Sequence, residues 1–263
     1  MKKLQQYLQG KSPDPALCED AIFQNDYFVA VIDGVTAKGR RLYKGMTSGA
    51  YAADVLCREL VHMKADAAAA EVILALNEAL RSAACEDAPP EDRPQANLVI
   101  FSRAKSEVWL FGDCQFMVGG NIFAFPKEVD LLLASLRAFI AQDLIRQGMS
   151  PDAASTESRE RIMPYLKVQS GFANSAGPYG YDVLDGGNIN TDHIQIVPAR
   201  SGDLVVLASD GYPKLFETLE ESERYLREML ERDPYCIHEN RQTKGRSDGN
   251  LSYDDRAYIS FRV

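Results

Sequence analysis

The chain has 263 residues, 46% of them hydrophobic, so it can bury one large core or two modest ones. It carries 38 acidic and 29 basic side chains, and the formal net charge of −9 argues against a general nucleic-acid-binding surface. Because no stretch reaches the roughly eighteen apolar residues of a membrane span and the N-terminus lacks an apolar region, we expect neither membrane association nor a signal peptide.

The cysteines and histidines show no metal-binding spacing. The cysteines are odd in number, scattered and free of any CxxC pair: Cys18, Cys57, Cys85, Cys114 and Cys236. This pattern is typical of reduced thiols in a cytoplasmic protein without a zinc site. We therefore expect a cytoplasmic location, and we also expect a monomer.

The first third of the chain predicts one buried strand. Residues 11–20 form a Pro-rich entry that we expect to follow a sheet edge. A strand is expected over 27–33, because residues 27–32 are apolar and mostly β-branched or aromatic, which is typical of a strand buried on both faces. This run stops abruptly at Asp33-Gly34.

Two helices and a linker are expected next. Apolar residues recur at helical spacing over 47–63, with Thr47 or Ser48 as the N-cap. An Ala-rich second helix is expected over 66–84, capped by Asp66, and the acidic, Pro-rich residues 86–95 are expected to form a linker.

The middle of the chain predicts strands followed by helices. Residues 96–103, 107–112 and 114–118 indicate a strand meander with turns near Lys105 and Asp113. An amphipathic helix is expected over 128–147, ended by Gly148, and a second over 151–166 with Asp152 near its start. The Gly-rich, aromatic residues 167–187 favour either a mobile loop leading to a short strand or a plain surface connection.

The last third predicts strands at 193–198, 204–209 and 256–262, a helix at about 219–231 and a charged, Gly-rich loop over 233–250. Long strands cluster separately from long helices, and no regular βαβ repetition occurs. This pattern indicates an α+β fold.

Acidic residues recur at strand ends. Asp33-Gly34 and Asp210-Gly211 each end an apolar strand, Asp254-Asp255 precedes the last one, and Asp113 follows another. A single Asp-Gly pair is most often a turn. Converging carboxylates repel one another unless a cation lies between them, and Mg²⁺ and Mn²⁺ prefer oxygen ligands. The repetition therefore favours a divalent-cation site.

Five short motifs occur in this order: Cys18-Glu19-Asp20, Asp33-Gly34, Gly112-Asp113-Cys114, Ala208-Ser209-Asp210-Gly211 and Asp254-Asp255. They resemble the ordered motifs of the metal-dependent protein phosphatases of the 2C type, in the spacing of the bacterial members, from about residue 11 to the C-terminus. The resemblance implies two stacked antiparallel β-sheets flanked by helices, an α-β-β-α sandwich. It also implies a single domain over residues 1–263 with a helical or flap insertion at about 126–187.

The resemblance further implies a site for two Mg²⁺ or Mn²⁺ ions and a possible third. Asp33 would bridge two ions, with Glu19 and the carbonyl of Gly34 serving one and Asp210 and Asp254 the other. Asp113 would help to hold the third ion. Asp255 would bind metal, orient Asp254 or do neither, whereas Asp20 could be an acceptor behind the ligands or an ordinary cap. Asp33 and Asp210 are the residues expected to be essential for catalysis.

The chain differs from the family at the position whose side chain binds the substrate phosphate. The family commonly has an Arg a few residues before its Glu-Asp pair, whereas this region reads Ser12-Pro13-Asp14-Pro15, with Lys11 as the nearest cation. The histidine that follows the Asp-Gly pair in eukaryotic members also has no counterpart, because Val35 follows Gly34.

The implied reaction is hydrolysis of phosphoserine or phosphothreonine in a phosphorylated protein substrate by a hydroxide that bridges the two ions. Two alternatives stay open. One is a catalytically weak relative that serves regulation or scaffolding, and the other is a small-molecule phosphatase.

Overall fold

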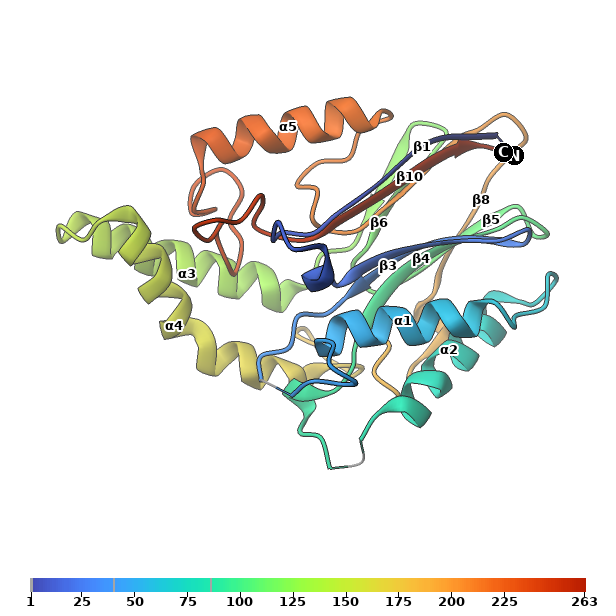
Figure 1. The fold of residues 1–263 in the computed structure, drawn as a ribbon, viewed down its shortest axis with the longest axis horizontal. Helices are drawn as coiled ribbons and strands as arrows, with labels where there is room; N and C mark the ends of the chain where they lie inside the picture. Colours follow the sequence, from blue (N-terminus) through green and yellow to red (C-terminus); the bar gives the residue numbers. More distant parts are fainter. Residues whose placement is uncertain (1, 40, 86) are drawn as a thin grey trace.

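Within the described residues, 2–39, 41–85 and 87–263, ten strands form two antiparallel sheets of five that stack face to face (Figure 1). The first sheet has the order β2 (Asp20–Gln24), β3 (Phe28–Gly34), β4 (Ala96–Ser102), β5 (Glu107–Phe111) and β8 (Gln195–Pro198). The second has the order β1 (Lys2–Gln9), β10 (Arg256–Arg262), β9 (Leu204–Ala208), β6 (Gln115–Val118) and β7 (Asn121–Ala124). The expected α+β sandwich is confirmed.

The apolar run of β3 is buried on both faces. Val29 and Val31 belong to the core between the sheets, together with Val205 and Ile259 of the second sheet. The alternate residues, such as Ile32, pack in a separate core beneath the helices. A strand covered on both sides has no polar face, which explains the absence of polar alternation.

Three helices cover the outer faces of the sandwich. Figure 1 shows α1 (Ser48–Leu60) and α2 (Ala69–Ala83) over the first sheet and α5 (Leu219–Arg232) over the second. Thr47 caps α1 as expected, because its side chain accepts a hydrogen bond from the backbone N–H of Ala50 at 3.3 Å. The expected Asp66 cap is wrong, since α2 begins three residues later, behind Ala68, and has no side-chain cap.

The helices α3 (Glu128–Arg146) and α4 (Pro151–Gln169) form a pair at the end of the sandwich opposite the two termini (Figure 1). Val129 and Leu133 of α3 pack against Ile162 and Leu166 of α4. α3 also carries apolar side chains on its outer face, where Phe139 is 70% exposed. It is therefore less amphipathic than its sequence indicates.

Several strands differ from the sequence expectation. β1, β2 and β7 were not expected, because β1 and β7 are edge strands with mostly exposed side chains and β2 is short. The meander over 96–118 is wrong at its third strand. β4 and β5 pair, but β6 lies in the other sheet, so the chain crosses between the sheets at Gly112-Asp113.

Hydrogen bonds hold the segment after α4, residues 170–187, against its neighbours. α4 extends to Gln169, beyond the expected end, and the loop expected over 167–187 contains the isolated bridges Ala173–Tyr181 and Ala96–Leu184 before it leads to β8. Asn174 Nδ2 donates to the carbonyl of Val183 at 2.9 Å, and the Asn77 side chain of α2 bonds Gly186 and Gly187. Among the described residues, no helix is both long and apolar enough to cross a bilayer.

Candidate metal-binding active site

Asp33 is delivered to the end of the sandwich by the buried strand β3. Antiparallel pairing places Asp20 of β2 on one side of it and Asn97 of β4 on the other. The next residue must be glycine, because a Cβ on Gly34 would overlap the carbonyl oxygens of Glu19 and Gly49. The close approach of these backbones holds Asp33 at a fixed position.

Asp113 reaches the same place from the crossover between the sheets. Gly112 has a φ of +100°, a left-handed conformation that favours glycine, and a Cβ there would also overlap the Asn97 side chain. This turn ends β5 and sends the chain into β6 of the second sheet. Asp113 therefore sits between the two sheets.

Asp210 follows β9 in the second sheet, next to the start of β10. Gln115 of β6 fixes this turn, because its Nε2 donates to the carbonyls of Ser209 at 3.0 Å and Tyr212 at 2.7 Å. Gly211 lies so close to the carbonyl of Asp255 that no Cβ would fit. The two C-terminal acidic motifs are thus held side by side.

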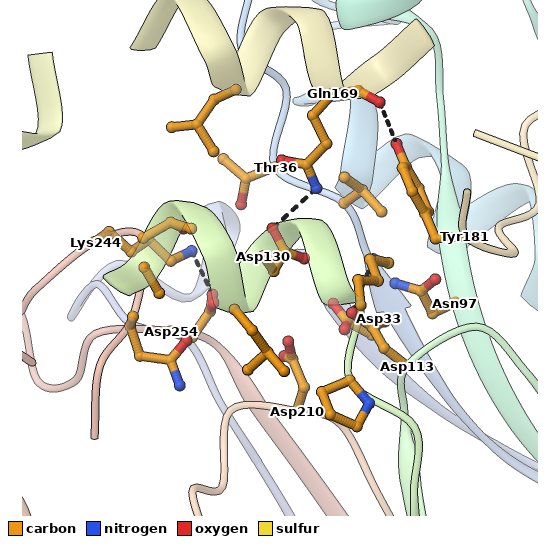
Figure 2. Close-up of a pocket in the computed structure, with 18 of the residues that line it drawn as sticks. Asp33, Thr36, Asn97, Asp113, Asp130, Gln169, Tyr181, Asp210, Lys244 and Asp254 are labelled. Atoms are coloured by element: carbon orange, nitrogen blue, oxygen red, sulfur yellow. Dashed lines mark hydrogen bonds and ion pairs between the residues drawn. The ribbon is translucent and has the colours of Figure 1, made fainter. Parts of the chain in front are cut away.

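These three aspartates converge. One carboxylate oxygen from each of Asp33, Asp113 and Asp210 lies within 4.8 Å of the others. They line a cavity of about 710 Å³ that Asp254 also lines. Figure 2 shows the aspartates on its floor, with Asp130 of α3 and Gln169 of α4 above them. Side chains separated by up to about 220 positions in the sequence therefore share one site.

The peripheral carboxylates are paired with lysines. Lys11 Nζ lies 2.7 Å from Asp255, 3.1 Å from Glu19 and 3.9 Å from Asp254. Lys244 Nζ lies 2.7 Å from Asp254, and Lys127 Nζ lies 2.8 Å from Asp113. The structure thus assigns Lys11, whose role the sequence left open, to the carboxylates beside the central cluster.

Burial raises the pKa of Asp33 above its ordinary value, and repulsion from Asp20 and Asp113 raises it further. Burial likewise raises the pKa of Asp210, with added repulsion from Asp33 and Asp113. Asp210 is open to solvent from the cavity side, but the cavity walls surround it on the others. Without a cation, the centre of the site thus disfavours full ionisation.

Asp254 behaves differently. Burial acts to raise its pKa, but attraction by Lys244 and Lys11 outweighs that effect and holds the pKa below its ordinary value. Asp254 therefore remains a carboxylate over the whole neutral pH range.

Metal-free protein is expected to lose stability as the pH rises from about 4 toward neutrality. Between their ordinary pKa near 3.8 and the raised folded-state pKa, Asp33 and Asp210 hold protons that the unfolded chain has released. The free energy of unfolding should therefore fall by up to about 1.4 kcal/mol per pH unit for each such group. Urea denaturation in chelator at a series of pH values measures the slope. An unchanged slope in Asp33→Asn/Asp210→Asn would contradict this origin.

The residues fit hard divalent cations. Asp113 Oδ1 is buried and accepts no hydrogen bond from any described residue. Carboxylate oxygens that close together match the roughly 2.0–2.6 Å ligand distances of such ions. Seven acidic residues lie at the site or beside it: Glu19, Asp20, Asp33, Asp113, Asp210, Asp254 and Asp255. Three lysines pair with some of them: Lys11, Lys127 and Lys244. When all seven acids are ionised, four negative charges remain unbalanced, which equals the charge of two divalent ions.

Several residues of the cavity were not expected from the sequence. Lys127, just before α3, lies beside Asp113 and over the ring of Tyr181, 5.0 Å from its centroid. Thr36, three residues after Asp33, bonds Glu19 through its hydroxyl. Proximity to the Asp-Gly pair could have indicated Thr36, but no sequence pattern links Lys127 to Asp113.

No protein-family model and no curated protein sequence matches the chain. Solved structures match it in fold at low sequence identity. The catalytic domain of serine threonine protein phosphatase PstP, in complex with two manganese ions, is 16% identical over 100% of both chains, with a TM-score of 0.52. Serine/threonine phosphatase Stp1 from Staphylococcus aureus is 16% identical, with a TM-score of 0.52, over 100% of this chain and 95% of that one. The S. agalactiae serine/threonine phosphatase is 11% identical, with a TM-score of 0.50, over 98% of both. The resemblance seen in the motifs is confirmed at the level of architecture: the chain has the fold of the bacterial metal-dependent serine/threonine phosphatases of the 2C type.

Proposed function

We propose that the protein is a metal-dependent phosphomonoester hydrolase acting on phosphoserine or phosphothreonine in proteins. The observation that carries the proposal is the convergence of Asp33, Asp113 and Asp210 in one cavity at the end of the sandwich. The shared fold with serine/threonine phosphatases supports the same reaction class.

The acidic residues would hold Mg²⁺ or Mn²⁺, two ions with a possible third. Asp33, Asp210 and Asp113 supply the converging oxygens, and the Gly34 carbonyl and Asp254 lie beside them on the cavity wall. Such ions lower the pKa of a water and neutralise phosphoryl oxygens. Glu19 and Asp255 would act on the ions indirectly, because Lys11 already contacts both carboxylates.

The protein's own cations would assist. The Lys127 ammonium sits between Asp113 and Tyr181, where it pairs with Asp113 and adds positive charge at the cavity. Lys244 and Lys11 keep Asp254 ionised. α3 and α4 wall the cavity on one side, which limits the access of bulk water and strengthens each of these interactions.

One observation favours a second candidate, a phosphatase-like protein with weak activity that serves regulation or scaffolding. Three lysines pair with four of the carboxylates, Glu19, Asp113, Asp254 and Asp255, so part of the negative charge of the site is balanced without any metal.

Hydrolysis of p-nitrophenyl phosphate in Mn²⁺, with and without chelator, distinguishes the two candidates. We expect turnover that requires the metal, and we expect Mn²⁺ to raise the midpoint of thermal unfolding, because an ion that binds only the folded state stabilises it. Stabilisation without turnover would leave only the binding protein, and neither effect would reject both. Phosphopeptides compared with sugar and nucleotide phosphates would separate a protein phosphatase from a small-molecule phosphatase.

Three further expectations belong to this proposal. The expected insertion at about 126–187 in a single domain would comprise the α3–α4 pair and the segment that follows it. A cytoplasmic location rests on the cysteine pattern, and a monomeric state stays a prediction.

A further inference from the structure

Six lysine and arginine side chains line the cavity, and two of them, Lys127 and Lys244, are already paired with carboxylates. Of the other four, Arg93 and Arg241 are exposed, whereas Lys38 and Arg159 are partly buried and form no ion pair with any residue in the described parts of the chain. Cations held in a partly buried site without a partner are costly, and an anionic ligand would offset that cost.

Lys38 lies in the loop between β3 and α1. Its backbone N–H donates to the carbonyl of Glu91 at 3.2 Å, which anchors the loop. Its Nζ donates to the carbonyl of Thr36 at 2.7 Å, and this bond uses one of three ammonium donors. Two donors are therefore left for a ligand in the cavity.

Arg159 comes from α4 and lines the same cavity. Its Nη1 donates to the carbonyl of Thr243 at 2.7 Å, in the loop that carries Lys244. A guanidinium has five N–H donors, so four remain after this bond. The bond anchors one end of the planar group, and free guanidinium donors can pair with carboxylate or phosphate oxygens.

Both cations have a lowered pKa, and the charge of Arg159 acts on Lys38. Burial lowers the pKa of Lys38 to about 8, and the charges of Arg159 and Lys244 lower it further. Burial also lowers the pKa of Arg159. An anion bound between the two side chains would relieve both effects.

The two cations share acidic neighbours with the central aspartates. Asp130 and Asp254 act on both Lys38 and Arg159, and Asp254 also acts on Asp33 and Asp210. Figure 2 shows Asp254 with Lys244 on one side of the cavity and Asp33 with Asp113 on the other. A subsite at Lys38 and Arg159 would thus lie in the same cavity as the central aspartates.

We propose that Lys38 and Arg159 form a subsite for a second anionic group of the substrate, a carboxylate or phosphate on the peptide that carries the scissile phosphoserine. The inference rests on the proposed phosphatase function and adds a substrate class to it. Acidic or multiply phosphorylated peptides would be preferred over peptides with neutral flanks. The subsite also provides anion contacts in a chain that lacks the Arg before the Glu-Asp pair.

Steady-state kinetics with three phosphoserine peptides test the subsite: one with Glu flanks, one with a second phosphoserine, and one with Gln flanks. We expect the wild-type protein in Mn²⁺ to favour the anionic peptides by about tenfold or more in kcat/KM, mainly through KM. Arg159→Gln and Lys38→Gln should each remove most of this preference. Arg161→Gln, on the same helix but paired with Glu157 at the surface, should keep it. The relative rates on Glu and phosphoserine flanks show which anion the subsite takes.

Equal turnover of all three peptides by the wild-type protein, or a preference retained in both variants, would overturn the subsite while leaving the phosphatase function standing. A variant that fails to unfold cooperatively is set aside, and the other carries the test. If the wild-type protein hydrolyses none of the peptides, the proposed function fails. Fluorescence anisotropy of the labelled Glu-flanked peptide then decides the subsite, with about tenfold weaker binding expected in Arg159→Gln and unchanged binding counting against it.

Discussion

Replacing Asp33 with asparagine is expected to lower metal-dependent kcat/KM by at least about a thousandfold, or roughly 4 kcal/mol of transition-state stabilisation. Asp33 lies between Asp20 and Asn97 in the sheet and converges with Asp113 and Asp210. An amide oxygen is a weaker ligand than a carboxylate and carries no charge to balance the ions. The fold should survive, because the substitution keeps the size of the side chain and relieves repulsion at a buried anion.

Two measurements and one control isolate the site. Calorimetric titration with Mn²⁺ should show weakened binding in Asp33→Asn, and metal-free protein should melt at the same temperature as wild type or higher. Asp26→Asn, in the exposed turn before the other end of β3, should change neither turnover nor binding. Wild-type turnover in Asp33→Asn would reject the site.

The strand ends that carry the aspartates could be predicted because buried strands leave a strong local signal. β3, β5 and β9 read as largely apolar runs, and each is buried along almost its whole length. The acidic residue that follows such a run necessarily lies at a sheet end. Convergence of those ends follows from the sandwich architecture, which the family resemblance supplied and periodicity alone could not.

The edges of the sheets could not be predicted for the opposite reason. β1 pairs only with β10 and keeps most side chains half-buried or exposed, so its polar sequence carries no burial pattern. The crossover at Gly112-Asp113 looks like a hairpin turn in sequence, because a positive φ serves both geometries. Only pairing partners distant in the chain decide which sheet β6 joins.

The pairing of the site's lysines with their carboxylates was also beyond sequence reasoning, although Lys11 was named from the sequence as the nearest cation. Lys11, Lys127 and Lys244 come from loops or a helix start, where side-chain direction follows no period. Arg159 lies on a helix face that turns toward the cavity only because α4 packs against α3. Charged side chains that are brought together by tertiary packing have no fixed spacing in the sequence, so their contacts could not be predicted from it.

Replacing Arg137 with leucine is expected to destabilise the protein by about 3 kcal/mol or more, the largest stability effect expected from a single side chain away from the metal site. Arg137 lies on α3 and is fully buried. Its Nη1 donates to the carbonyls of Tyr235 at 3.1 Å and Gln242 at 3.0 Å, and its Nη2 donates to Ser155 Oγ at 2.7 Å. Leucine would leave these acceptors without a donor.

In Arg137→Leu, the loop that carries Lys244 should lose its structure before the whole protein unfolds, because the carbonyls that lose their donor belong to this loop. We expect the thermal midpoint to fall by roughly 6–12 °C and protease cleavage within 233–250 to appear below that midpoint. Arg146→Leu, on the same helix but paired only with Asp143 at the surface, should shift stability by less than about 0.5 kcal/mol. Equal melting of the two variants would show that the guanidinium does not hold the loop. Selective cleavage in Arg137→Leu would show that α3 orders the wall of the cavity on which Lys244 and Asp254 meet.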